Sequence, residues 1–355
     1  MEFANLSSPS PAMTLSSADD RRAAAWWLLA CAALVFAMIV VGGITRLTHS
    51  GLSIVEWQPI VGAVPPLDDA QWQEAFDKYK QTPEYLQVNR GMALPQFKGI
   101  FWWEYAHRLL GRLIGVVFFV PLVWLALRRR IPRAVLPRLA AIFVLGGVQG
   151  ALGWYMVQSG LVDDPRVSQY RLAAHLGLAA AIYAAILWTA LDLLRPAAPE
   201  PGPAAPAGLR RFALALAAIV FVMMLSGAIV AGIRAGLAYN TFPLMDGHVL
   251  PPEAFVLEPW IRNVFSNMAL VQFDHRLIAW TLALLVPWFW VRSRRDAPPG
   301  RARLAADALL ALVIVQIALG ISTLLLRVPV PLAAAHQAGA MAVFTAALVA
   351  AHALR

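Results

Sequence analysis

The sequence predicts an all-α integral membrane protein with eight spanning helices, arranged as two pseudo-symmetric four-helix bundles. Hydrophobic residues make up 60% of the chain and charged residues only 14%, whereas soluble domains are roughly 25% charged. Eight segments reach about the 20 residues that a spanning helix needs. Matching motifs recur in the same order in the two halves, and this predicts a parallel internal repeat.

Six of the expected spans carry no formal charge, namely 23–45, 139–162, 172–191, 212–233, 308–326 and 328–354. The other two, 105–127 and 269–291, carry charged residues near their starts. A charge in hydrocarbon costs several kcal/mol unless it is paired or faces a cavity, so such residues are functional candidates. These two spans are therefore where we expect a site.

The chain divides into four parts. Residues 1–22, rich in Ser, Pro and Ala, are expected to be a disordered cytoplasmic N-terminus. The next apolar stretch is too long for a signal-peptide core and should stay as an anchor. A Pro/Ala linker at 195–208 separates an N-terminal bundle, 23–194, from a C-terminal bundle, 209–355, because its prolines cannot continue a helix. Cys31 stands alone, which excludes a disulfide within the chain and a Cys-x-x-Cys-His attachment of haem.

Arginines gather in the short connections at 128–138 and 292–303 and around the linker. The positive-inside rule then places both termini in the cytoplasm and the long segments 46–104 and 234–268 outside, in the inner membrane of a bacterium. The net charge of +9 reflects this topology and contact with anionic lipid. Nucleic-acid binding is disfavoured because the basic residues are dispersed among separate loops.

Four histidines occupy matching places in the two halves. His107 and His275 each precede an arginine and a leucine, and His175 and His336 each follow two alanines. We expect all four within about the first two turns of their helices, near the outer face. Neutral imidazole is a good ligand of iron, and two facing helices can hold a haem iron between one histidine from each. The pattern predicts two haem sites, with His107 and His175 in one and His275 and His336 in the other.

Other residues near these histidines leave alternatives open. A lone histidine in a membrane helix is usually a hydrogen-bonding group, but four at matched positions favour metal binding. The remaining three histidines, which have no matched partners, are interpreted as interfacial or loop residues: His49, His248 and His352. Arg108 and Arg276 could each bind a haem propionate or form a salt bridge to a local acid, Glu104 or Asp274.

The two copies differ in one ionisable residue. Glu104, three residues before His107, has the neutral Gln272 as its counterpart. A carboxylate beside one porphyrin could accept a proton, position water or stabilise a cationic intermediate. The alternative is a surface acid at the helix entrance that interacts with the N-terminal amides.

The repeat extends beyond histidine. Glycines recur near the ends of the first and fifth spans, at Gly42-Gly43 and at Gly227. The third and seventh spans share a Gln-x-x-x-Gly motif, ending at Gly153 and at Gly320. Small residues at such spacing allow close helix packing, and their recurrence in order supports duplication.

Over residues 25 to 353 the chain resembles the haem A synthase family, in the form found in alphaproteobacteria and mitochondria. The stretches that carry the resemblance are Gly51-Leu-Ser-Ile-Val-Glu56-Trp57, Pro95-Gln-Phe-Lys-Gly-Ile-Phe-Trp-Trp-Glu104-Tyr-Ala-His107-Arg108, Ala235-Gly-Leu-Ala-Tyr239-Asn240-Thr241-Phe242-Pro243-Leu-Met245-Asp-Gly247, Gln272-Phe-Asp-His275-Arg276 and Ala335-His336-Gln337. The resemblance implies a membrane oxidoreductase that converts the C8 methyl of haem O to formyl by successive hydroxylation.

The resemblance also implies roles for single residues. His275 and His336 would be the axial ligands of a resident haem b, His107 and His175 would face the haem O substrate, and Glu104 would be the catalytic carboxylate. Some bacterial members have a cysteine pair in the first outer loop; this chain has none there, so a thiol relay is unavailable and the electron donor is unidentified. Partners implied by the resemblance are haem O synthase and cytochrome oxidase assembly factors, and a homo-oligomer is compatible with it.

The residues alone also fit two other classes of protein. A di-haem b-type cytochrome that transfers electrons from quinol would need the same histidine pairs, but it would not need a carboxylate beside one haem only. A transporter would explain the repeat but not the matched ligands.

Overall fold

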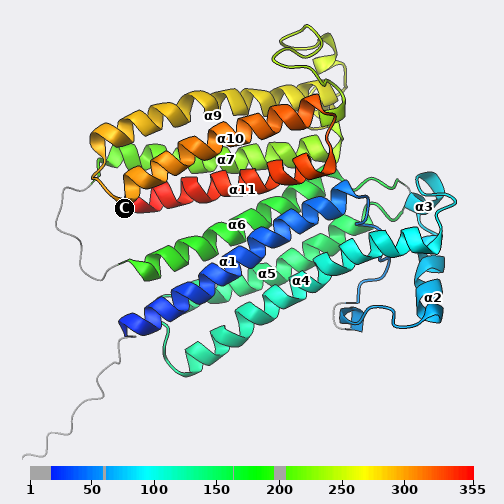
Figure 1. Ribbon diagram of the computed structural model, residues 1–355, viewed down its shortest axis with the longest axis horizontal. Helices are drawn as coiled ribbons and strands as arrows, with labels where there is room; N and C mark the ends of the chain where they lie inside the picture. Colours follow the sequence, from blue (N-terminus) through cyan, green and yellow to red (C-terminus); the bar gives the residue numbers. More distant parts are fainter. Residues whose placement is uncertain (1–16, 59–60, 163, 196–204) are drawn as a thin grey trace, which may run out of the picture.

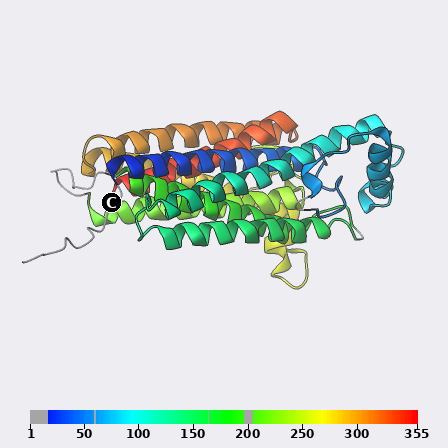
Figure 2. The ribbon, with the colours of Figure 1, turned by 90° about the horizontal axis from the view of Figure 1, so that it is seen from below.

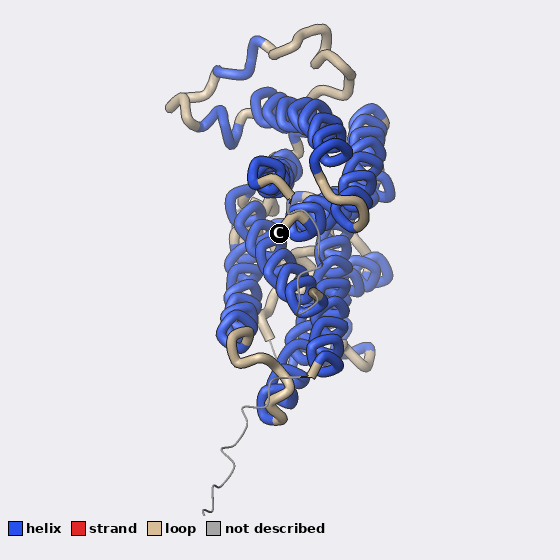
Figure 3. Tube along the Cα trace, turned by 90° about the vertical axis from the view of Figure 1, so that its left-hand side faces the viewer, coloured by secondary structure: helices blue, strands red, loops and turns tan. Residues whose placement is uncertain are grey.

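The computed structural model describes residues 17–58, 61–162, 164–195 and 205–355, and in that part the regular structure is helical (Figure 3). Eight helices are long and apolar enough to cross a membrane: α1 (Ala18–Leu47), α4 (Leu94–Leu127), α5 (Leu136–Gln158), α6 (Gln169–Leu194), α7 (Ala207–Gly232), α9 (Met268–Asp296), α10 (Arg301–Leu325) and α11 (Val330–Ala353). The predicted all-α integral membrane class is confirmed.

The long helices lie side by side in two groups (Figures 1 and 2). In the first group α1 contacts α4 and α6, and α5 contacts both α4 and α6. In the second group α7 contacts α9 and α11, and α10 contacts both α9 and α11. The groups meet along a seam where α6 contacts α7 and α11, and α1 contacts α11. This arrangement is compatible with the expected pair of four-helix bundles.

The buried core follows this seam. Fully buried side chains come from each of its four helices, such as Leu28 of α1, Ile186 of α6, Leu216 of α7 and Met341 of α11. Buried alanines lie among them, because small residues let membrane helices approach closely. By contrast, α4, α5 and α10 expose large apolar side chains, as expected of helices that face lipid.

Two helix starts differ from the sequence-based expectation. Helix α1 begins at Ala18 because Ser17 and Asp20 form a capping box, in which the Asp20 amide donates to Ser17 Oγ at 3.0 Å. Residues 18–22, which we expected to be disordered, are therefore helical; residues 1–16 lie outside the described part. Helix α7 begins at Ala207, inside the expected linker, of which residues 196–204 also lie outside the described part.

Helix α4 begins at Leu94, well before the expected start at residue 105. Its first turns leave the apolar span and pack on helix α2 (Asp69–Tyr79) of the first outer connection, while Tyr85 of the short helix α3 (Pro83–Gln87) packs against the same cluster. The contact is an aromatic cluster of Trp72, Phe76, Tyr79, Phe97, Phe101 and Tyr105. His107 therefore lies roughly 20 Å along the helix from its start, at 1.5 Å per residue, and its predicted position in the first two turns is wrong.

The short elements gather at one end of the molecule. Three 3-10 helices, η1 (Val61–Ala63), η2 (Ala235–Leu237) and η3 (Pro252–Phe255), and helix α8 (Arg262–Ser266) belong to the two long connections. In Figure 1 both connections lie at the opposite end from the C-terminus and the start of α1. The described ends of the chain thus share one end of the helix array.

Candidate functional site

Each of the four matched histidines lies against a glycine of a neighbouring helix in its own group. A Cβ atom at Gly42 of α1 would lie 3.0 Å from His107 Nε2, and one at Gly153 of α5 would lie 2.8 Å from His175 Cε1. The glycines noted in the sequence as packing residues therefore make room for imidazole rings.

The second group repeats this arrangement. A Cβ atom at Gly227 of α7 would lie 3.3 Å from His275 Cε1, and one at Gly320 of α10 would lie 2.9 Å from His336 Cε1. Each histidine on α4, α6, α9 or α11 thus has its own glycine on α1, α5, α7 or α10. The sequence repeat is also a repeat in packing.

Each expected histidine pair lies within one group of helices. His107 of α4 and His175 of α6 belong to the first group, and His275 of α9 and His336 of α11 belong to the second. All four residues are half-buried on helices of the bundles. Two imidazoles on separate helices of one bundle are a ligand set that suits iron porphyrin.

The C-terminal pair is held by polar neighbours at Nδ1. Ser226 Oγ lies 3.2 Å from His275 Nδ1, and the Gln316 amide nitrogen lies 3.1 Å from His336 Nδ1. Gln316 also donates to the His336 carbonyl at 2.9 Å. A ligating imidazole donates its Nδ1–H to an acceptor, which leaves Nε2 free for metal. Ser226 Oγ can accept in this way from His275, so His275 fits a bound haem iron. The Gln316 NH2 group is a donor, and its bond to the His336 carbonyl positions that turn of α11.

The N-terminal pair is less constrained. Gln149 donates to the His175 carbonyl at 3.0 Å but lies 3.5 Å from His175 Nε2, and His175 Nδ1 is buried with no hydrogen-bond partner among the described residues. At His107 it is Nε2 that lies nearest the position of a Gly42 Cβ. The two pairs therefore both pack on glycines and differ in the polar neighbours of their rings.

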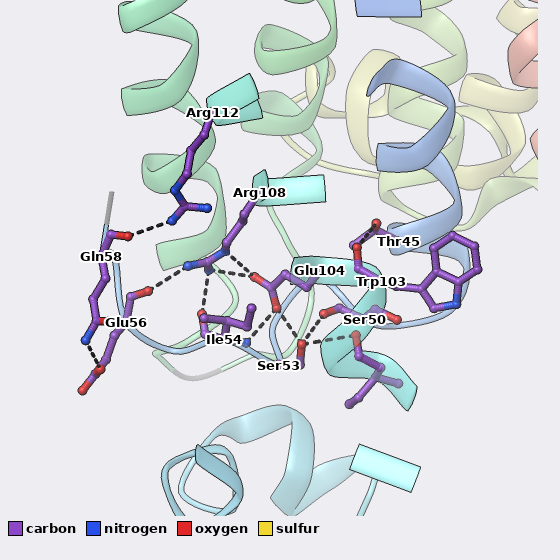
Figure 4. A network of polar contacts seen from close by, with 11 residues as sticks. Thr45, Ser50, Ser53, Ile54, Glu56, Gln58, Trp103, Glu104, Arg108 and Arg112 are labelled. Carbon is purple, nitrogen blue, oxygen red and sulfur yellow. Dashed lines mark hydrogen bonds and ion pairs between the residues drawn. The ribbon is translucent and has the colours of Figure 1, made fainter. Parts of the chain in front are cut away.

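Glu104, three residues before His107 on α4, forms the centre of a buried polar network (Figure 4). Its carboxylate is 2% exposed and accepts hydrogen bonds from Ser53 Oγ and the Ile54 amide, both at 2.7 Å. It also accepts from Arg108 Nε at 3.0 Å and from Arg108 Nη2 at 2.7 Å. The alternative of a surface acid at the helix entrance is wrong, because the longer α4 places Glu104 well inside the helix.

Arg108 connects helix α4 to the first outer connection. Besides Glu104, it donates to the Ile54 carbonyl at 2.6 Å and to the Glu56 carbonyl at 2.7 Å. One turn further along α4, Arg112 donates to the Gln58 carbonyl at 2.7 Å (Figure 4). Of the two alternatives for Arg108, a haem propionate or a local acid as its partner, the structure shows the ion pair with Glu104.

Arg276 connects helix α9 to the second outer connection, there through backbone carbonyls. It donates to the Thr241 carbonyl at 2.9 Å and, at longer distances, to the carbonyls of Tyr239, Pro243 and Leu244. The neighbouring Gln272, buried where Glu104 lies in the first half, donates to the Tyr239 carbonyl at 3.1 Å. Propionate binding by either arginine stays a prediction.

These loop contacts are what sequence reasoning missed. The acceptors are backbone carbonyls, which have no sequence signature; the only signal was the motif-rich outer stretches near residues 51–57 and 235–247. Glu84 of α3 was also missed: it is 3% exposed, and burial, with a smaller contribution from the charge on Glu104, raises the pKa of its carboxyl to about 7.

The three unmatched histidines lie apart from both pairs. His49 is exposed in the turn after α1, and His248 lies in the second outer connection with Nδ1 3.2 Å from the Asp246 carbonyl. His352 is buried at the far end of α11, where Nε2 lies 3.0 Å from Asp192 Oδ1. The interpretation of His49 and His248 as loop residues is confirmed, whereas His352 is a buried hydrogen-bonding residue.

Fold and site together define a helical membrane protein with two histidines in each group of helices, a ligand set suited to haem. The family described as "Cytochrome oxidase assembly protein" (COX15-CtaA) matches residues 25–348. The chain is 64% identical over 323 residues to the haem A synthase of Nitrosospira multiformis, covering 91% of both chains. It is 58% identical to that of Nitrosomonas eutropha, covering 89% of both, and 53% identical to that of Parvibaculum lavamentivorans, covering 89% of this chain and 90% of the other.

The chain therefore belongs to this family, and the family expected from its motifs is confirmed.

Proposed function

We propose that the chain is a haem A synthase, a membrane oxidoreductase that converts the C8 methyl of haem O to formyl and so supplies haem A for terminal oxidase assembly. Relatives of that name match nearly the whole chain. The observation that carries the proposal is the histidine pair in each helix group, each ring packed on a glycine of that group, with a buried carboxylate three residues from His107 and a glutamine at the matching place in the second half.

His275 and His336 would hold a resident haem b. Support comes from Ser226, whose Oγ can accept from His275 Nδ1–H and so leaves Nε2 free for iron. Gln316 adds a hydrogen bond to the His336 carbonyl, which positions that turn of α11. A bound haem b supplies one-electron chemistry at its iron. The protein contributes the orientation of the axial rings and an apolar, water-poor surrounding.

His107 and His175 would face the haem O substrate. A site that must release its product benefits from weaker anchoring, and this pair has it: His175 Nδ1 lacks a partner among the described residues. Binding energy from the rest of the porphyrin would then position the reacting methyl.

Glu104 would act as the catalytic carboxylate. Four hydrogen bonds, two of them from its ion-pair partner Arg108, hold it fixed and buried, one turn from His107. A preorganised negative charge stabilises positive charge that develops nearby in a transition state. The matched Gln272 cannot do this, which is consistent with chemistry at one site only.

The site would lie toward the periplasmic side, with both termini in the cytoplasm. Arginine-rich short connections at the end of the array that holds the termini support this orientation. The protein would contact its electron donor and its assembly partners at the membrane.

Substituting each ligand singly by alanine tests the two assignments separately. His275→Ala and His336→Ala should each abolish the low-spin spectrum of the resident haem while the protein stays inserted in the membrane. A reduced spectrum unchanged in both variants would contradict the ligand assignment. Haem b as the sole pigment of the native protein, with no haem O or haem A, would favour the di-haem cytochrome.

A further inference from the structure

One polar contact across the seam joins the two histidine pairs. Gln337, which directly follows His336 on α11, donates to the Ile39 carbonyl of α1 at 2.6 Å. Its side-chain oxygen lies so close to Gly43 that a Cβ atom at Gly43 would overlap it. The C-terminal group thus reaches into the turn of α1 that ends in Gly42 and Gly43.

That same turn supports His107. Gly42 directly precedes Gly43 and packs against the His107 ring. A Cβ atom at Gly42 would lie 3.0 Å from His107 Nε2. A continuous set of contacts therefore runs from His336 through Gln337 and the Gly42-Gly43 turn to His107. Close-packed groups transmit small displacements because the interior has little free volume to absorb them.

The residues that match Gln337 and Gly43 in the other half are apolar. Leu176 follows His175 on α6 where Gln337 follows His336 on α11. Ala228 occupies the position on α7 that matches Gly43. The glutamine and the glycine that accommodates it thus belong to one copy of the contact only, as Glu104 belongs to one copy of the site only.

We propose that Gln337 is a positioning residue for the N-terminal histidine pair: it fixes the turn of α1 against which His107 rests. The proposal rests on the proposed function in that His107 faces haem O. It predicts that Gln337, although it adjoins His336, affects mainly the binding of haem O beside His107 in the first group of helices. A contact with a purely local role would act on His336 instead.

The first test is haem O binding to purified protein that retains its resident haem. Gln337→Met keeps the side-chain length but removes the donor, and we expect roughly tenfold weaker haem O affinity, the upper range for loss of one hydrogen bond. The low-spin spectrum of the resident haem should be unchanged. Thr345→Val is the matched control, since it removes the 2.6 Å contact between Thr345 and Tyr183 across the same seam, away from both pairs; it should leave haem O affinity unchanged.

A double-mutant cycle tests the contact itself. Gly43→Ala should weaken haem O binding at least as much as Gln337→Ala, because the new methyl displaces the glutamine. The double variant should be no worse than Gln337→Ala, since the shorter side chain leaves room for that methyl. Thermal unfolding of the same four proteins should show the same non-additivity, independent of activity.

Three results would overturn the inference: unchanged haem O affinity in Gln337→Ala, equal weakening by Thr345→Val, or additive effects in the cycle. A shifted resident-haem spectrum with normal haem O affinity would likewise overturn it and assign Gln337 to His336. Gln316→Ala, which removes the amide beside His336 Nδ1, shows what such a shift looks like. Native protein that binds no haem O would contradict the proposed function, an outcome distinct from failure of the Gln337 variants alone.

Discussion

Replacing Glu104 by glutamine separates the charge of this residue from its shape. The glutamine oxygen can accept from Ser53 and Ile54, as Glu104 does now, but its NH2 group then points at the two Arg108 donors. Two charge-assisted hydrogen bonds are lost. Arg108 keeps its two loop carbonyls, so each lost bond should cost near the lower figure of about 1.5 kcal/mol, and the two together about 3 kcal/mol of stability.

The second half of the chain indicates that the fold tolerates this change. Gln272 and Arg276 occupy the equivalent positions, and there the arginine is held by carbonyls alone. Glu104→Gln should therefore fold and bind haem O. If the negative charge stabilises the transition state, the rate should fall by roughly 2.7 to 4 kcal/mol, or about 100- to 1,000-fold.

The assay is the haem profile of membranes that contain the variant, with turnover measured at saturating haem O. Ser53→Ala is the control: it removes one hydrogen bond from the same carboxylate and keeps its charge, so the rate should fall less than about tenfold. Unreacted haem O should accumulate in Glu104→Gln but not in Ser53→Ala. Near-normal haem A in Glu104→Gln would refute the catalytic role, and equal losses in both variants would assign Glu104 to loop docking.

Three further predictions follow from the packing and the buried charges. His175→Ala should abolish haem A formation and spare the resident-haem spectrum; loss of both would indicate one shared site. Gly320→Ala should shift that spectrum by pressing on His336, whereas Gly146→Ala, where no atom lies within 4 Å of the added methyl, should not. Burial raises the pKa of Glu84 from 4.5 to about 7, so the folded state holds this proton more tightly and stability should fall as pH rises from about 4.5 to 7. Thermal unfolding of Glu84→Gln should lack this fall, with a gap of roughly 3 kcal/mol above pH 7; parallel pH profiles would refute the assignment.

Hydropathy was sufficient to predict the eight spans because hydrocarbon demands a continuous apolar segment of fixed length. It could not predict where α4 begins, since the turns from Leu94 onward leave the hydrocarbon and depend on an aromatic cluster with α2 and α3. The start of α1 was missed for a local reason. The capping box of Ser17 and Asp20 extends the helix beyond the apolar segment.

The candidate site was found from the cost of polar groups in the membrane, which marks His107 and His275 directly. That cost does not tell whether Arg108 binds a haem propionate or a group of the protein. Two of its acceptors are loop carbonyls, 52 and 54 residues away in the sequence. Nor does that cost reveal Glu84, whose burial is produced by the folded outer connection. Contacts made by backbone atoms or by long-range packing leave no residue pattern to detect.

The most direct measurement of the central claim is chromatography of the pigments extracted from the purified protein after incubation with haem O and a reductant in air. The proposed function predicts a resident haem b in every sample and conversion of added haem O to haem A by the native protein but not by His175→Ala. Haem b alone, with added haem O recovered unchanged by the native protein, would contradict it.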